Sequence, residues 1–321
     1  MCTRRLVVSM LPAVMMVLDP GAASGQDFPN KPIRIVTGGV GGNSDSVSRL
    51  VAQGISGPLG QQVVVVNFSS GNIPGQTVAK APPDGYSLLV AGATLWIGPL
   101  FQKAPPYDPV KDFAPVSLAV TEPAVLVVHP TLPVKSVKEL IALAKARPGE
   151  LNYAAGQTGS QSQLAGELFK YLAGVKMQTI PYAGGSARLA ELLGGQTQLI
   201  IDGASAVMQQ VKAGKLRALA VGSLKPSTLV PGLPTIAESG VPGYESMGRT
   251  GIFAPAKTPE PIIKRLNQEI VRFINLPETK AQLLGSGSEA AGSSPEELGA
   301  MVIAERERLG KVIKAAGIQP Q

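Results

Sequence analysis

Short runs of β-branched residues alternate with amphipathic helical stretches, and this alternation limits the possible folds more than any other feature of the chain. One run spans 33–37, and a second, at 63–67, holds four consecutive valines before its single polar residue. Such a continuous apolar run is typical of a strand buried on both faces. Apolar residues at helical spacing lie between them at 47–55, and a third run follows at 86–91. This order predicts a mainly parallel sheet with covering helices.

The alternation begins again after Pro123 and predicts a second α/β unit. The strands expected there, with helices between them, are 124–128, 151–155, 177–180, 198–202 and 217–221. The helix before Pro148 is expected to begin at Ser136, and another is expected over 161–173. No sequence repeat relates the two units.

The C-terminal part of the chain predicts a return to the first unit. Residues 225–246 are rich in Pro, Gly and Ser and are interpreted as a surface connection. A last strand is expected at 251–254, and Ser294 with Glu297 forms a capping box that opens the final helix. These tail helices need a core to lie on, so two strands should join two lobes, as in a hinge. We predict lobe 1 over 27–124 plus 247–321 and lobe 2 over 125–246.

The first 25 residues have the pattern of a cleaved signal peptide. Arg4 and Arg5 precede an apolar run at 6–18, which is too short to span a bilayer as a helix, and small residues follow at 21–25. A signal peptide predicts secretion to the periplasm, and an uncleaved signal anchor is the alternative. The only cysteine, Cys2, lies inside this segment, so the mature chain is expected to carry no disulfide, thiol nucleophile or thiolate ligand.

Composition narrows the choice of partner. Loss of the signal removes two arginines and one aspartate, which lowers the formal net charge from +7 to +6. A mildly basic surface favours small anions. The Lys and Arg residues are scattered and no nucleic-acid motif occurs, so binding to nucleic acid is not expected.

The first candidate site is the glycine-rich turn from Gly38 to Asp45, between an expected strand and an expected helix. Backbone N–H groups and the helix N-terminus favour a carboxylate or phosphate there. Asp45 or Ser44 is placed to cap the helix. The turn is not a dinucleotide fingerprint, because Ser44 stands where the third glycine is required. An ordinary glycine-rich turn is the alternative.

The second candidate is the turn at 155–163, where Thr158 and Ser160 add hydroxyl donors before a helix. A simple capped helix start is the alternative. Asp202 ends an expected strand, at the edge where open α/β sheets bind ligands. It is placed either to receive a ligand hydroxyl, ammonium or water, or to cap the next helix.

No catalytic or metal-binding constellation is evident. His129 is the only histidine and is interpreted as a structural residue at a strand end. One histidine without cysteine leaves most metal sites and nucleophile triads without ligands or bases. A serine-hydrolase elbow is also absent from the sequence. We therefore expect neither an enzyme nor a cofactor.

Ten segments in fixed order resemble the tripartite tricarboxylate transporter substrate-binding receptors, also called Bug-type or TctC-like receptors. The segments are P-I-R-I-V (32–36), G-G-N-S-D (41–45), P-L-G-Q-Q-V-V-V-V-N (58–67), V-A-K-A-P-P-D-G-Y-S-L-L (78–89), Y-D-P-V-K-D-F-A-P-V (107–116), L-V-V-H-P-T-L-P-V-K-S-V-K-E-L-I-A-L-A-K (126–145), P-G-E-L-N-Y-A (148–154), L-L-G-G-Q (192–196), A-G-K-L-R-A-L-A-V (213–221) and F-A-P-A-K-T-P (253–259). No single motif is diagnostic, but the ordered set covers essentially the whole mature chain.

The resemblance implies an α/β, type II periplasmic binding fold, with two α/β lobes joined by two crossover strands and a ligand cleft between them. It implies a carboxylated metabolite held between 41–45 and 157–160, in some relatives through ordered waters. The ligand-binding residues expected here are Gly41, Gly42, Asn43, Ser44, Asp45, Thr94, Gln157, Thr158, Gly159, Ser160, Gln163, Tyr182, Asp202 and Ser205.

Three departures from the family pattern bear on the ligand. Many relatives have a Pro-aromatic pair in the first loop, where this chain has Thr37-Gly38-Gly39 and a loop that looks one residue shorter. A frequent histidine is Gln163 here, and the frequent Tyr-Lys-Gly is Tyr182-Ala183-Gly184. These changes remove a ring and two possible cationic donors. The ligand is therefore expected to be less negative than a tricarboxylate, or held more by hydroxyl and amide groups.

Together these features predict a monomeric periplasmic receptor that captures a small mono-, di- or tricarboxylate, or an aromatic acid, by lobe closure. Its expected partners are the organic acid and the membrane permease subunits of a tripartite transporter. An extracytoplasmic sensor that presents its closed form to a signalling partner is the alternative.

Overall fold

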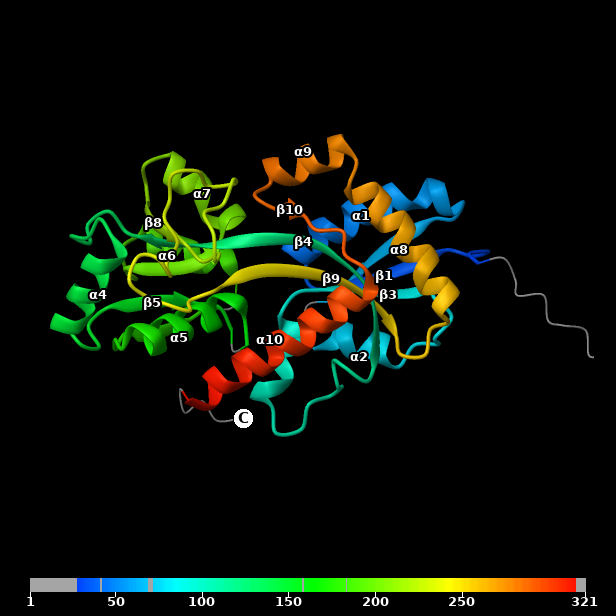
Figure 1. Cartoon of the computed structure of the whole chain (residues 1–321), viewed down its shortest axis with the longest axis horizontal. Helices are drawn as coiled ribbons and strands as arrows, with labels where there is room; N and C mark the ends of the chain where they lie inside the picture. The colour runs from blue at the N-terminus through cyan, green and yellow to red at the C-terminus, as the bar shows by residue number, and fades with distance from the viewer. Residues whose placement is uncertain (1–27, 41, 69–71, 158, 183, 316–321) are drawn as a thin grey trace, which may run out of the picture.

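Two long antiparallel strands cross the molecule and join its two halves (Figure 1). The computed structural model describes residues 28–40, 42–68, 72–157, 159–182 and 184–315. Strand β4 (Phe113–Val128) pairs with strand β9 (Met247–Pro255), from Phe113 opposite Pro255 to Pro123 opposite Met247. Beyond this pairing, β4 continues into the sheet of the other half. We call the half that contains β1 the first lobe and the half that contains β5 the second lobe.

The first lobe is a mixed sheet covered by helices on both faces. Its hydrogen-bonded order is β2-β1-β3-β9-β4, and the pairs β1–β2 and β1–β3 are parallel. Its other strands are β1 (Ile33–Thr37), β2 (Val63–Asn67), β3 (Ser87–Ala91) and β10 (Glu289–Ala290). Its helices are α1 (Asn43–Leu59), α2 (Ile73–Ala79), α3 (Thr94–Ile97), the 3-10 helix η1 (Gly98–Phe101), α8 (Glu260–Ile274), α9 (Pro277–Gly285) and α10 (Pro295–Ala315).

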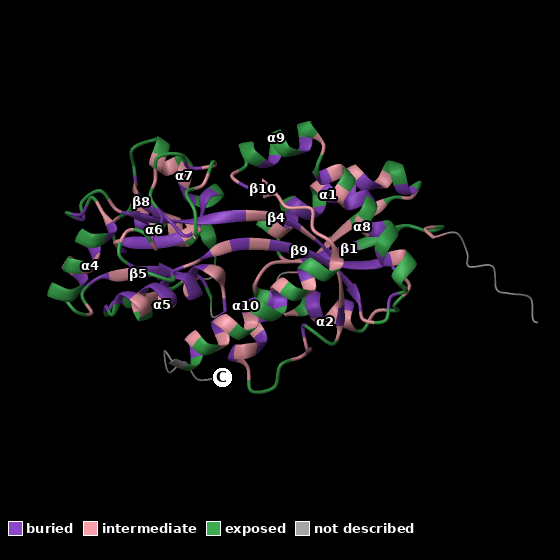
Figure 2. Cartoon of the chain, viewed as in Figure 1, coloured by how far each residue is buried: buried purple, intermediate pink, exposed green. Residues whose placement is uncertain are grey.

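Apolar stripes on these helices build a core on each face of the sheet. On one face, Val51 and Ile55 of α1 pack with Leu266 of α8. On the other face, Trp96 and Val302 belong to a cluster that includes strand residues. The stripes recur at helical spacing, so each helix buries one side and leaves the other in solvent, as the burial colours in Figure 2 show.

The second lobe has the same layered arrangement around a different set of strands. Strand β5 pairs in parallel with β6 and β7, and residues 124–128 of β4 pair antiparallel with β7 and β8. The strands are β5 (Asn152–Ala155), β6 (Gln178–Pro181), β7 (Leu199–Gly203) and β8 (Arg217–Val221). The helices are α4 (Val137–Ala146), α5 (Gln161–Ala173), α6 (Gly185–Leu193) and α7 (Ala204–Lys212).

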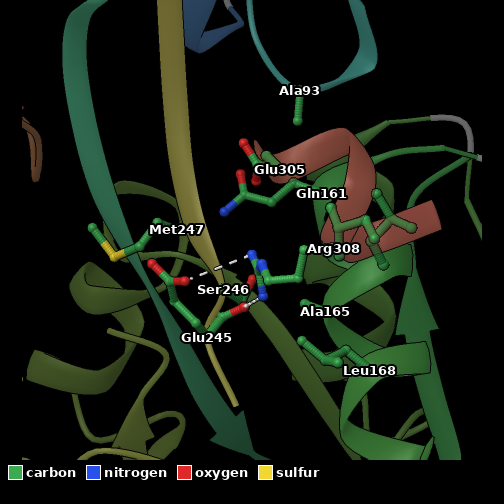
Figure 3. Close-up of a pocket in the computed structure, with 11 residues that line it drawn as sticks. Ala93, Gln161, Ala165, Leu168, Glu245, Ser246, Met247, Glu305 and Arg308 are labelled. Carbon is green, nitrogen blue, oxygen red and sulfur yellow. Dashed lines mark hydrogen bonds and ion pairs between the residues drawn. The ribbon is translucent and has the colours of Figure 1, made fainter. Parts of the chain in front are cut away.

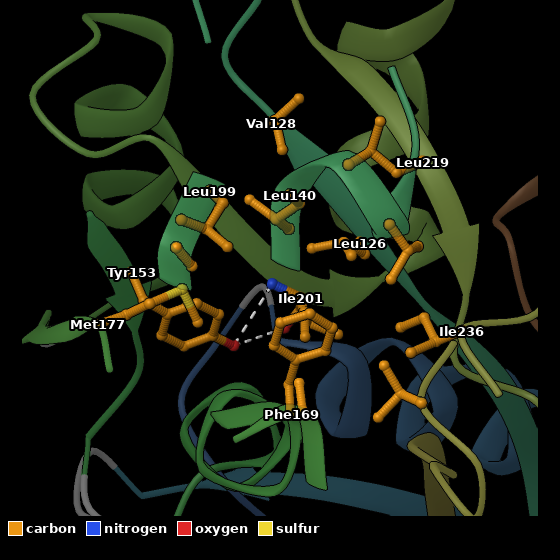
Figure 4. Packing of buried hydrophobic residues seen from close by; sticks show 14 of the residues in the cluster. Leu126, Val128, Leu140, Tyr153, Phe169, Met177, Leu199, Ile201, Leu219 and Ile236 are labelled. Carbon is orange, nitrogen blue, oxygen red and sulfur yellow. Dashed lines mark hydrogen bonds between the residues drawn. The ribbon is translucent and has the colours of Figure 1, made fainter. Parts of the chain in front are cut away.

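Hydrophobic clusters cover both faces of the second-lobe sheet, so the loops lie at its edge. Tyr153, Phe169 and Leu140 lie together on one face (Figure 4). Leu192 of α6 and Val207 of α7 belong to the cluster on the other face. Because helices cover both faces, side chains from the carboxyl ends of β5, β6 and β7 can reach a ligand only at the sheet edge.

Most predicted elements lie at the predicted positions. The strands at 33–37, 63–67 and 217–221 and the helix at 161–173 have the bounds expected from the sequence. The capping box is confirmed: Glu297 N–H donates to Ser294 Oγ at 3.1 Å, and Ser294 N–H donates to Glu297 Oε2 at 2.8 Å.

Three predictions about elements were wrong in part. Strand β4 begins at Phe113 rather than 124, and β9 begins at Met247 rather than 251. Prolines in a strand normally indicate an edge or an interruption, and here register shifts beside Pro115 and beyond Leu118 let the strand continue. Residues 225–246 are not only a surface connection, because Ile236 and Tyr244 are buried in the second-lobe core.

Across the described ranges, no helix combines the length and apolar character that a membrane span requires. The predicted signal peptide, at 1–25, lies outside the described residues.

Candidate ligand-binding cleft

The predicted site residues lie where strands of both lobes pass into helices. Gly42 to Asp45 follow β1, and Thr94 follows β3. Ser160 and Gln163 follow β5, Tyr182 follows β6, and Asp202 and Ser205 lie at the passage from β7 to α7. Gly41 and Thr158 lie outside the described residues. These strand ends are the usual ligand edge of open α/β sheets.

The first-lobe residues border a small cavity. Ser44 and Thr94 both line a space of about 100 Å³ together with Gly38 and Tyr107. Burial raises the pKa of Tyr107 to about 12, so its hydroxyl remains protonated at neutral pH. Sequence reasoning missed Tyr107, because nothing in its local pattern connects it with the turn after β1.

The prediction that Asp45 or Ser44 caps α1 was wrong. Gly42, which has no side chain, is the N-cap. Asp45 lies in the first turn, where its buried carboxylate pairs with Arg49 at 3.0 Å and accepts from Asn67 Nδ2 at 2.8 Å. The same Asn67 amide donates to the Gly38 carbonyl at 2.8 Å. Asp45 therefore helps to tie the turn to the end of β2.

The second-lobe turn is held by its own side chains. Ser160 is the N-cap of α5 and accepts from the backbone N–H of Gln163 at 3.3 Å. The Gly159 N–H donates to Gln163 Oε1 at 2.7 Å, and the Gly156 N–H donates to Ser162 Oγ at 2.9 Å. Several backbone donors of this turn thus have internal partners. Fewer backbone donors of this turn are therefore open to a ligand than the sequence indicated.

Asp202 contacts a residue that sequence reasoning missed. Arg188, in the first turn of α6, pairs through Nη2 with Asp202 Oδ2. The side chains are 11% and 14% exposed, respectively. The other Asp202 oxygen accepts from the Gly203 N–H at 3.0 Å, and the cap of α7 is Gly203 without a side-chain cap bond. The alternative role of Asp202 as a side-chain cap for α7 is therefore excluded.

Glu122 joins predicted site residues of the two lobes. It lies on β4 and is 4% exposed. Its Oε1 accepts from the Ser205 N–H at 2.6 Å, and its Oε2 accepts from Asn43 Nδ2 at 3.4 Å. Burial raises the pKa of Glu122, and the charge of Asp202 raises it further, while the hydrogen bonds from Ser205 oppose these effects. Sequence reasoning missed Glu122, because its strand was expected to begin at 124.

Tyr182, Gly159 and His129 make contacts that suit structural roles. Tyr182 packs partly against the apolar cluster under α6 and α7. A Cβ at Gly159 would lie 3.4 Å from Gly98 Cα, so the second-lobe turn meets η1 of the first lobe. His129, at the end of β4, hydrogen-bonds Thr131 through Nδ1 at 2.7 Å, in agreement with a structural role.

A separate contact between the lobes lies at α10 (Figure 3). Arg308 pairs with Glu245 at 3.7 Å, and Arg249 bridges Glu245 at 2.9 Å and Glu305 at 3.3 Å. Gln161 borders the same space, whose volume is about 20 Å³. That volume admits about one water and no organic acid. We interpret this cluster as structural support beside the crossing strands.

The described residues contain no group of three or more His, Cys, Asp and Glu side chains arranged to hold a metal ion. The chemical groups at the candidate cleft are hydroxyls, amides, helix N-termini and the charges of Glu122, Arg188 and Asp202. Such groups can bind and orient a small anion.

This arrangement defines the class of two-lobed α/β solute-binding proteins. A model of the "Tripartite tricarboxylate transporter family receptor" family matches residues 47–318, and the chain belongs to that family. The family description concerns transport, so the alternative that the chain is a sensor is not favoured.

Curated relatives and solved structures agree with this assignment. The chain is 36% identical to the "UPF0065 protein in tcbD-tcbE intergenic region" of Pseudomonas sp. (strain P51), over 97% of this chain and 94% of that one. It is 34% identical to Protein BugT of Bordetella pertussis, over 92% of each chain.

Two similar solved structures carry ligands. R. palustris Rpa4515 with adipate is 37% identical, with a TM-score of 0.84 over 92% of this chain and 100% of that chain. MatC from Rhodopseudomonas palustris with bound malate is 29% identical, with a TM-score of 0.79 over 89% of this chain and 100% of that chain. The predicted family, two-lobed fold and receptor class are confirmed.

Proposed function

We propose that this chain binds a small carboxylate between its lobes and closes around it. The observation that carries the proposal is the bridge from Asn43 through Glu122 to Ser205. This bridge brings the N-termini of α1 and α7, one from each lobe, close to one carboxyl group, which supports a site between them. Helix N-termini favour anions. The solved relatives with adipate and malate support a carboxylate as the anion.

The proposed lobes move as units with the bounds 27–124 plus 247–321 and 125–246. A ligand drives closure only if it binds the closed form better than the open form. Groups from both lobes that contact one ligand supply this difference. The proposed site residues are those predicted from the sequence, joined by Tyr107, Glu122 and Arg188.

The proposed setting is the periplasm, reached through a cleaved signal peptide, where the monomer delivers its ligand unchanged to permease subunits. The family description and the periplasmic relatives support this setting. The proposed function does not include binding to nucleic acid.

A thermal-shift screen of organic acids tests binding directly. A ligand at a concentration of 100 times its Kd should stabilise the native protein by about 2.7 kcal/mol. Replacement of the α5 N-cap, Ser160→Leu, should abolish the shift, because the larger side chain fills the cleft side of the turn.

The matched control is Ser136→Leu at the N-cap of α4, whose hydroxyl makes the same kind of capping bond at 3.2 Å. Both variants should lose about 1 kcal/mol of stability with the cap. Only Ser160→Leu should lose the ligand response. A full response in Ser160→Leu would contradict the proposed site, and no response of the wild type to any acid would contradict the proposed function.

A further inference from the structure

Arg188 lies where three strand-to-helix passages of the second lobe meet. It belongs to the first turn of α6, its guanidinium pairs with Asp202 of β7, and it approaches the turn between β5 and α5. A Cβ at Gly156 would lie 2.8 Å from Arg188 Nη1 and would also collide with Ser160 Oγ. The absence of a side chain at Gly156 therefore leaves room for both the guanidinium and the hydroxyl of the predicted ligand turn.

One hydrogen-bond donor of the Arg188 guanidinium has no partner. Asp202 takes Nη2, while Nε is buried and has no hydrogen-bond partner. A buried donor without a partner is unfavourable, and native structures seldom keep one without a reason. The planar guanidinium offers N–H groups that match a carboxylate in two-point contact. A ligand carboxylate at the guanidinium would add a second anionic partner while Asp202 keeps its contact with Nη2.

The charges around the cleft restrict the ligand further. Arg188 is opposed by Asp202, and the buried carboxyl of Glu122 lies on the crossing strand nearby. The positions where the resemblance led us to look for cationic donors hold Gln163 and Ala183. Because Asp202 offsets part of the Arg188 charge, this cation suits one further ligand carboxylate. A third negative charge on the ligand would lie near Asp202 and Glu122 without a positively charged partner.

We infer that Arg188 determines specificity for dicarboxylates: one ligand carboxylate lies at the helix N-termini and the second at the Arg188 guanidinium, which Asp202 positions. This inference rests on the proposed function. It names the ligand class and a residue that selects it.

The test compares a diacid with its own half-ester. Affinities are measured calorimetrically for succinate and adipate and for the monomethyl ester of each, which keeps the carbon chain between the two carboxyl groups but removes one charge. The wild type should prefer diacid to half-ester. Arg188→Gln should reduce this preference by about tenfold to a hundredfold, the range expected for a hydrogen bond to a charged group.

Two further variants separate recognition from support. Arg188→Gln leaves the Asp202 charge unpaired and so endangers folding, whereas the double variant Arg188→Gln/Asp202→Asn removes both charges and should show the same loss of preference. Asp202→Asn keeps an oxygen that can accept from Arg188 and removes the opposing charge, so the preference for the diacid should be kept or increased.

The matched control is Lys170→Gln, which removes one positive charge from a half-buried ion pair with Glu167 toward the far end of α5. It should keep the wild-type preference. If Arg188 were only structural, its variants would weaken diacid and half-ester equally, and that result would overturn the inference while the receptor function stands. A wild type that binds only monocarboxylates would also overturn it, whereas a wild type that binds no acid at all would overturn the proposed function itself.

Discussion

Glu122 is a buried carboxyl group between the two lobes, and it accepts hydrogen bonds from both of them. Ser205 and Asn43 donate to its two oxygens from α7 and α1. Burial nevertheless raises its pKa above the ordinary value of 4.5, and burial likewise raises the pKa of Glu305. The ionised forms are therefore less favourable in the folded protein than in the unfolded chain.

This pKa shift gives a prediction at the residue scale. As pH rises above 4.5, the unfolded chain releases the Glu122 proton before the folded protein does, so stability falls until pH passes the raised pKa. Glu122→Gln should remove this part of the fall, and its stability relative to the wild type should rise across that interval. Urea unfolding at a series of pH values measures the difference.

The control for this prediction is the exposed Glu260, whose pKa is lowered by its hydrogen bond with Lys264. Its titration lies below 4.5, so Glu260→Gln should leave the same interval unchanged. Parallel curves for Glu122→Gln and wild type would show that the Glu122 carboxyl is not buried as described.

At the scale of elements, α10 shows how a local signal and a distant contact act on one helix. Its start is fixed by the Ser294–Glu297 capping box, which the sequence reveals. Its later turns contribute Glu305, which accepts from Trp96 Nε1 at 3.1 Å, and Arg308, which donates to the Glu245 carbonyl at 3.1 Å. The capping box thus sets where the helix begins, and tertiary contacts set where it lies.

Removal of the cap should weaken the helix without altering the cleft. Ser294→Ala should lower the free energy of unfolding by about 1 kcal/mol. Glu297→Gln keeps an acceptor for the Ser294 N–H, so its effect should be smaller. Chemical denaturation gives the stabilities and calorimetry the ligand affinity, which should match the wild type in both variants. An equal loss of stability in the two would contradict the capping arrangement.

At the scale of the whole molecule, the lobes also touch through contacts outside the pairing of β4 with β9. The loop after α9 approaches the start of α7, where a Cβ at Gly287 would lie 2.8 Å from Ser205 N. Thr228 of the second lobe donates to Glu289 of the first at 3.0 Å. We interpret these contacts as belonging to a closed arrangement.

A methyl group at Gly287 should act as a wedge between the lobes. Gly287→Ala should weaken ligand binding by about tenfold, which corresponds to about 1.4 kcal/mol, and enlarge the radius of gyration of the ligand-saturated protein in X-ray scattering.

Gly232→Ala is the matched control. Gly232 has nearly the same left-handed φ, 86° against 85°, and open space where a Cβ would lie. Each variant should lose about 1–2 kcal/mol of stability through backbone strain. Unchanged affinity in Gly287→Ala would show that this contact plays no part in closure.

The sequence by itself determined the elements, because their signals are local. Alternation of β-branched runs with helical stripes located the strands at 33–37 and 63–67 and the helix at 161–173. Glycine-rich turns after strands also indicated most of the residues now found at the strand ends of both lobes. These patterns depend on hydrogen bonds and burial within a few residues, which the order of amino acids displays directly.

Only the tertiary structure decided how the site is connected. Glu122 joins Asn43 and Ser205, and Arg188 pairs with Asp202 beside the turn at Ser160, across separations that no local pattern encodes. The role of a charged side chain depends on its desolvation and on its partners, and both arise when strands and helices pack. For that reason Asp45, which the sequence indicated as a possible helix cap, proved to be tied to Asn67 and Arg49. Arg188, which carries no signal of its own, lies beside the predicted ligand turn.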